Sequence, residues 1–156
     1  MNKFKTVMSF VCIFVVCGFF YACNSKETDN GYYQYPTDDS MKASKLLEVC
    51  RIPEDTLKKM SEEQLAQAVA DFPLLHEVEL AYSTEYGIEC LASNSDAYRE
   101  LLQRENAKDA LIEKIKELES KSDHAALVEI LKDVVINEKK FSNTFTEEEK
   151  EYLKIK

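Results

Sequence analysis

The chain has few of the residues on which many folds and sites depend. Its 156 residues include no tryptophan, three glycines, three prolines and two histidines. Propellers, sandwiches, glycine-rich phosphate loops and dinucleotide folds need more turn glycines than this. The two histidines, His76 and His124, leave little for His-based metal or triad chemistry. We therefore expect neither a cofactor nor a metal ion.

Acidic residues outnumber basic ones, 29 to 20, which gives a net charge of −9. Phosphate contacts need positively charged faces, so this balance excludes nucleic acid as an expected partner. Apolar residues make up 45% of the chain, enough to build a core. The length corresponds to one domain at roughly 150 residues per domain.

The first 23 residues carry the most specific signal in the sequence. Lys3 and Lys5 precede an uncharged, mostly apolar run over residues 7–20. This run has the length of a signal-peptide core and falls short of the about 20 residues that a spanning helix needs. The segment therefore predicts export.

The apolar run ends at a small residue followed by cysteine, Ala22-Cys23. This ending resembles a bacterial lipoprotein signal, in which the cysteine becomes the acylated first residue. We predict that residues 1–22 are removed and that Cys23 carries the lipid, because several acyl chains hold far more firmly than one. Removal would leave 18 basic residues against 29 acidic ones, a net charge of −11. A plain secretory signal and an uncleaved anchor remain alternatives.

Residues 23–40 indicate a polar tether, with Gly31 and Pro36 and no sustained hydrophobic period. The tether contains a cluster of aromatic residues, Tyr32, Tyr33 and Tyr35. These tyrosines could form a docking motif for another molecule. The simpler interpretation, which we favour, is a linker whose tyrosines lie against the following domain.

From residue 41 onward the apolar pattern is helical. One buried face has apolar residues at i, i+3, i+4 and i+7, namely Ala43, Leu46, Leu47 and Cys50. Capping boxes at residues 61–64 and 146–149 predict two helix starts. A strand is a fair alternative only at residues 134–136, which are all β-branched. We predict an all-α fold for residues 41–156, a compact bundle of about seven short helices.

Several segments together resemble an uncharacterised family of bacterial lipoproteins and secreted helical proteins. Its pattern is "IPEexLkxMSxeeL…YP", and the matching residues here are 52–65, 72–73, 87, 100–104 and 110–114. The likeness covers about residues 50–153, although Phe72 stands where tyrosine is usual. Its motifs are helix starts, caps and apolar anchors. The resemblance therefore implies an envelope location and a helical fold, and it transfers no active site.

Candidate chemistry is sparse in this sequence. His76-Glu77 begins like a zincin motif, but Leu80 stands where the second ligand is needed. Carboxylates are abundant, and a pair about 5–9 Å apart could cleave a glycosidic bond, yet nothing in the sequence singles out such a pair. We therefore assign no catalytic residue.

Cys50 and Cys90 are the remaining cysteines of the predicted mature chain besides Cys23. In an exported protein they could form a disulfide, closing a loop of about 40 residues worth about 4 kcal/mol in the chain-entropy model. Two separately buried thiols explain the sequence equally well, since Cys50 completes an apolar face.

These observations predict a membrane-anchored lipoprotein of the bacterial cell envelope, periplasmic or surface-exposed. Its partners would be the membrane, through the lipid anchor, and another envelope protein. We expect a non-enzymatic interaction module whose acidic surface favours a basic partner. The alternatives are a carboxylate-based envelope hydrolase and a single-pass membrane protein with an uncleaved N-terminal anchor.

Overall fold

The structure, a computed structural model, describes residues 31–36, 40–75 and 85–155. Several features of the sequence lie outside the described residues: the predicted signal peptide, the lipid-attachment cysteine and the zincin-like pair, that is residues 1–22, Cys23, His76 and Glu77. Among the helices of the described ranges, none combines the length and the apolar character needed to cross a membrane.

Within the described ranges the chain forms eight helices and no strand. They are α1 (Ala43–Val49), α2 (Glu54–Leu57), α3 (Glu62–Ala70), α5 (Glu85–Asn94), α6 (Asp96–Leu101), α7 (Ala107–Glu119), α8 (Ala125–Asn137) and α9 (Glu147–Leu153). The predicted all-α fold is thus confirmed. Residues 134–136, the one place where a strand was a fair alternative, lie inside α8.

Both predicted capping boxes are present. The Ser61 hydroxyl accepts a hydrogen bond from the Gln64 backbone N–H at 3.2 Å, and the Gln64 side chain accepts one from the Ser61 N–H at 2.8 Å. Thr146 and Glu149 make the same reciprocal pair at the start of α9, at 3.2 and 2.6 Å. These bonds satisfy backbone donors that the first helical turn leaves without partners, so the two helices begin at the positions that the sequence predicts.

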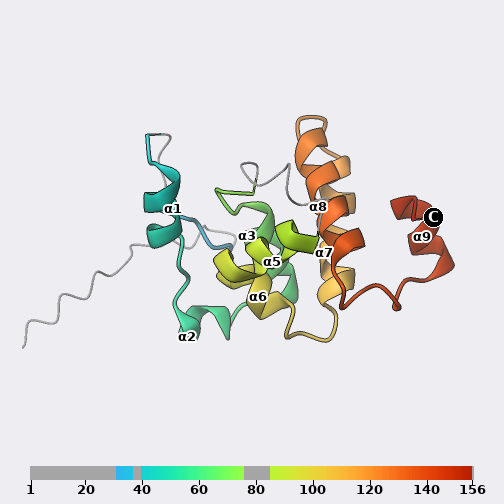
Figure 1. Ribbon diagram of the computed structural model, residues 1–156, viewed down its shortest axis with the longest axis horizontal. Coiled ribbons are helices and arrows are strands. Elements are labelled where there is room, and N and C mark those ends of the chain that lie inside the picture. Colours follow the sequence, from blue (N-terminus) through green and yellow to red (C-terminus); the bar gives the residue numbers. More distant parts are fainter. Residues whose placement is uncertain (1–30, 37–39, 76–84, 156) are drawn as a thin grey trace, which may run out of the picture.

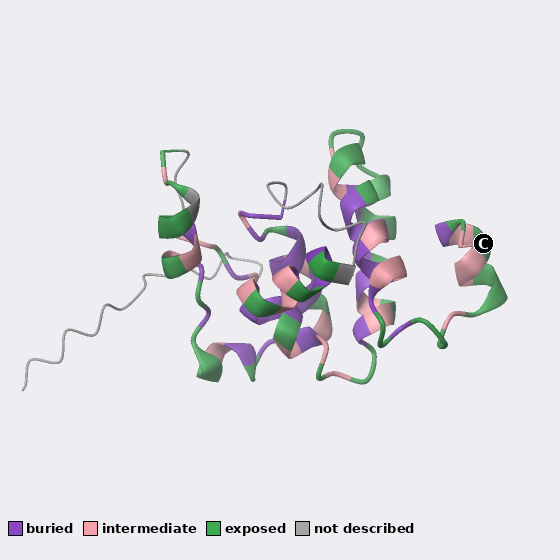
Figure 2. Cartoon of the chain, viewed as in Figure 1, coloured by how far each residue is buried: buried purple, intermediate pink, exposed green. Residues whose placement is uncertain are grey.

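The core lies where α3, α6, α7 and α8 meet (Figures 1 and 2). Helix α7 packs against both α8 and α3, and α3 also packs against α6. Completely buried aliphatic side chains fill this centre, among them Leu65, Leu101, Leu111, Ile115 and Leu131. Helices α1 and α9 lie at opposite ends of the molecule (Figure 1).

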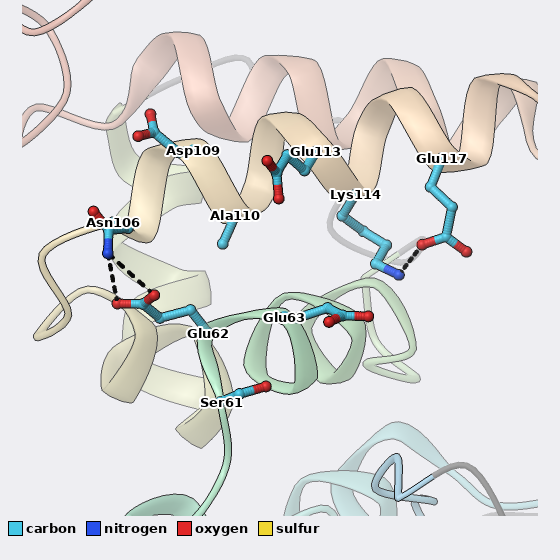
Figure 3. A pocket seen from close by; sticks show the side chains of 9 residues that line it. All are labelled: Ser61, Glu62, Glu63, Asn106, Asp109, Ala110, Glu113, Lys114 and Glu117. Carbon is cyan, nitrogen blue, oxygen red and sulfur yellow. Dashed lines mark hydrogen bonds and ion pairs between the residues drawn. The ribbon is translucent and has the colours of Figure 1, made fainter.

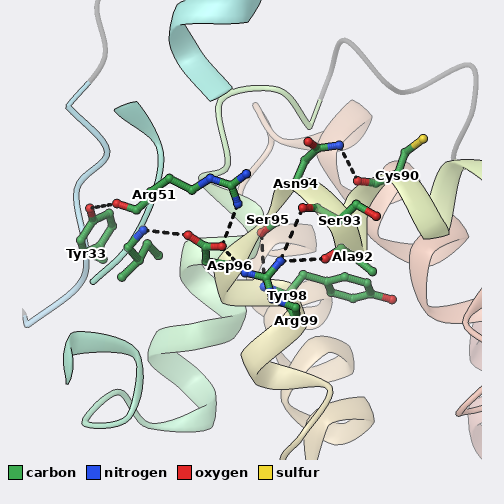
Figure 4. Close-up of polar contacts among 11 residues, drawn as sticks. Tyr33, Arg51, Cys90, Ala92, Ser93, Asn94, Ser95, Asp96, Tyr98 and Arg99 are labelled. Carbon is green, nitrogen blue, oxygen red and sulfur yellow. Dashed lines mark hydrogen bonds and ion pairs between the residues drawn. The ribbon is translucent and has the colours of Figure 1, made fainter. Parts of the chain in front are cut away.

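A buried carboxylate ties the segment between α1 and α2 to the start of α6 (Figure 4). Asp96 accepts hydrogen bonds from the Ile52 backbone N–H and from the Arg51 guanidinium, both at 3.0 Å, and pairs with Arg99. Because Asp96 follows the N-cap Ser95, its charge also lies at the positive end of the helix dipole. The buried charge is tolerated here because both carboxylate oxygens of Asp96 have hydrogen-bond partners.

Residues 31–36, which we call the strap, lie against α3. The Gln64 amide donates to the Gly31 carbonyl at 2.8 Å, and the Tyr35 hydroxyl donates to the Ala68 carbonyl at 3.0 Å. The Tyr35 ring packs edge-on against Tyr33 and Phe72. The interpretation that the tether's tyrosines lie against the domain is therefore confirmed.

Candidate functional site

A groove of about 550 Å³ runs between the start of α3 and one side of α7 (Figure 3). Its wall contains five carboxylates and a single ammonium group. The carboxylates are Glu62, Glu63, Asp109, Glu113 and Glu117, and the ammonium group belongs to Lys114. The groove is therefore strongly acidic, and it is the candidate functional site of the described residues.

Helical spacing explains why the carboxylates gather here. Asp109, Glu113 and Glu117 are four residues apart, which places them in one row along α7. Leu111 and Ile115 are buried on the opposite side of the same helix. The row of carboxylates therefore faces the groove and not the core. The two glutamates of α3 occupy its first turn, where the helix dipole favours negative charge.

The groove carboxylates differ in how they are paired. Glu62 accepts from the Asn106 amide at 3.3 Å, and Glu63 accepts from the Tyr32 hydroxyl at 2.6 Å. Asp109 is 3.5 Å from the Lys108 ammonium group. Within the part of the chain that the structure describes, no hydrogen bond or ion pair engages Glu113. Its charge is therefore available to a ligand.

The one ammonium group of the groove is already neutralised. Lys114 is only 2% exposed, and it donates to the Gln67 side chain at 2.7 Å and pairs with the Glu117 carboxylate. Lys121 donates to the same carboxylate at 2.8 Å. These two lysines lower the pKa of Glu117 to about 2. The Lys114 charge therefore does little to offset the other four carboxylates.

The five carboxylates of the groove can attract positively charged groups. No group of three or more His, Cys, Asp or Glu side chains in the described ranges is placed to hold a metal ion. A general acid needs a pKa near the working pH, whereas the pKa of Glu117 is displaced in the opposite direction. What the groove offers is several negative charges at close spacing, which suits the ammonium or guanidinium groups of a basic ligand.

The histidine and the two cysteines considered in the sequence, His124, Cys50 and Cys90, do not line this groove. His124 stands at the N-cap position of α8 without a capping hydrogen bond, 3.5 Å from the Asp123 carboxylate. Cys50 is buried at the end of α1, and Cys90 is half-buried on α5. No disulfide links these two cysteines in the structure as described, and their pairing stays a prediction.

Sequence reasoning missed the groove, because acidic residues are common throughout this chain. One local signal was available: the row at positions 109, 113 and 117 has the spacing of a single helix face. No local signal placed residues 62 and 63 in the groove. They lie beside the row only because α3 packs on α7.

The structure is that of a small all-α protein with an acidic groove. No family model matches the chain, and no curated protein or solved structure matches it either. The resemblance to the lipoprotein family therefore stays an expectation drawn from the segments quoted above.

Proposed function

We propose that this chain is a bacterial envelope lipoprotein and that its helical domain is a non-enzymatic binding module. Cys23 carries the lipid anchor, and the groove between α3 and α7 binds a basic segment of another envelope protein. The observation that carries the proposal is the groove itself, whose wall has five carboxylates and one ammonium group. The resemblance of residues 50–153 to envelope proteins supports the location.

The strength of charge pairs indicates what kind of partner fits. A single exposed pair between a lysine and a carboxylate contributes only about 0–1 kcal/mol, because water and salt screen it. One isolated cation would therefore bind too weakly to matter. A segment that presents several lysine or arginine side chains along the groove gains several such contacts at once. We therefore favour an extended basic segment over a small cationic molecule.

The groove is tested by titrating hexalysine peptide into the full mature chain in detergent micelles, by calorimetry at low and at physiological salt. The double variant Asp109→Asn/Glu113→Gln should weaken binding by about tenfold, since two pairs of about 0.7 kcal/mol each are lost. The control Glu129→Gln/Glu151→Gln removes the same charge from exposed positions outside the groove.

The control variant should bind nearly as well as the unchanged chain, and binding should weaken as salt rises. Equal losses in the two double variants would mean that overall charge, and not the groove, holds the peptide. Binding that ignores salt would also contradict the proposal.

The lipid anchor is tested separately by labelling cells with palmitate. The Cys23→Ser variant should incorporate no label and should accumulate as an unprocessed precursor. Unchanged incorporation would refute attachment at Cys23. Mass spectrometry of the mature N-terminus separates the alternatives, because an uncleaved anchor retains residues 1–22 and a plain secretory signal leaves a start without lipid.

A further inference from the structure

The strap and the acidic groove share side chains at one point. Tyr32 of the strap donates its hydroxyl hydrogen to Glu63 at 2.6 Å, and its ring lies 5.7 Å from the Lys114 ammonium group. Both Glu63 and Lys114 line the groove. The next residue along α3, Gln64, holds the Gly31 carbonyl. The N-terminal end of the strap is therefore fastened to the wall of the groove.

The contact between Tyr32 and Glu63 is one that a basic ligand can replace. A carboxylate binds an ammonium or guanidinium group more strongly than a neutral phenol, because both partners of the pair are then charged. A lysine of a ligand placed at Glu63 therefore removes the acceptor that holds the Tyr32 hydroxyl.

From this shared point we infer that the strap and a basic ligand compete for the Glu63 end of the groove. Binding of the ligand frees Tyr32 at the start of the strap, while Tyr33 stays buried in the core, and docking of Tyr32 weakens binding of the ligand. The two effects are equal in size, because coupling between binding equilibria is reciprocal. The inference rests on the proposed function. It adds that a ligand in the groove changes how the start of the strap is held.

Hydrogen exchange on the full mature chain in detergent micelles tests the coupling, with hexalysine as the probe. On addition of the peptide, exchange of the amides at the start of the strap, Gly31 and Tyr32, should rise severalfold while that of α7 and α8 stays unchanged. The Tyr32→Phe variant removes the competing hydroxyl and should bind hexalysine about threefold more tightly. The matched control is Tyr152→Phe, which removes a hydroxyl bonded to Glu119 at 2.7 Å, far from the strap, and should leave the affinity unchanged.

The outcomes separate this inference from the proposed function. If hexalysine binds the unchanged chain but strap exchange stays constant, the groove binds and the coupling is refuted. Weaker binding by Tyr32→Phe would also refute it, because the hydroxyl would then be part of the binding site and not a competitor. If the unchanged chain does not bind hexalysine at all, both the proposed function and the coupling fail.

Discussion

The core and the strap are held by different kinds of contact. Leu65, Leu111 and Ile115 in the core are completely buried and meet only through apolar packing, which needs no particular partner atom. The strap is held by hydrogen bonds from Gln64 and Tyr35, by ring contacts, and by Tyr33, which is buried in the core. Removing one core side chain loosens many neighbours, whereas the hydrogen bonds of Gly31 and Tyr32 at the start of the strap can break while Tyr33 stays buried.

This difference means that the two regions should open at different free energies. Segments with few buried apolar contacts open locally, while core helices open only when the whole domain unfolds. The start of the strap, Gly31 and Tyr32, can therefore respond to a ligand without loss of the fold.

The core should be the most sensitive region. Leu65→Ala should lower the free energy of unfolding by about 2–5 kcal/mol, because it leaves a cavity in the packing around α3. Urea denaturation measures the loss. Leu127→Ala on α8, where the side chain is only half-buried, serves as the control and should cost clearly less. A loss below about 1 kcal/mol for Leu65→Ala would show that this position is not in the core.

The second largest loss of stability should follow removal of the buried Asp96 carboxylate, which joins α6 to the segment before α2. Asp96→Ala leaves the Ile52 N–H without its acceptor, and it should cost about 1–3 kcal/mol. Glu105→Ala, which changes an exposed residue, should stay within about 0.5 kcal/mol of the unchanged chain. Equal effects of the two variants would refute the structural role of Asp96.

A side chain at Gly31, the first residue of the strap, should loosen the strap. Gly31 has a φ of +75°, and a Cβ there would lie 3.2 Å from the Gln64 amide nitrogen. Other residues adopt this conformation at a cost of about 1–2 kcal/mol. Gly31→Ala should therefore speed hydrogen exchange of the strap about tenfold and leave the urea midpoint of the core nearly unchanged. A large shift of that midpoint would mean that strap and core unfold together.

The smallest effect should be the pH dependence that Glu117 contributes. Its pKa in the folded chain is about 2, below the ordinary value of 4.5, so the folded state binds fewer protons than the unfolded state between these values. The stability advantage of the unchanged chain over Glu117→Gln should be full above pH 4.5 and should shrink as the pH falls toward 2. Urea midpoints at pH 5 and pH 2.5 measure it, and a constant advantage would contradict the pairing with Lys114.

Much of the fold could be predicted because its signals are local. The capping boxes and the helical spacing of apolar residues depend only on neighbours within a few positions, and both were found where expected. The groove and the strap contacts depend on segments that are far apart in sequence. In the sequence, Asp96 and Lys114 look like ordinary surface charges, and only the packing of several helices makes them buried.

We propose that a basic segment binds in the groove between α3 and α7 rather than anywhere on an acidic surface. The most direct measurement is an NMR titration of the isotope-labelled mature chain in detergent micelles with hexalysine, following each backbone amide. We expect the largest shifts at residues 62–63 and 109–117, with the strap, residues 31–36, changing at the same peptide concentrations. Shifts that are spread evenly over the acidic surface, or that are largest at residues 147–149 of α9, would contradict the account.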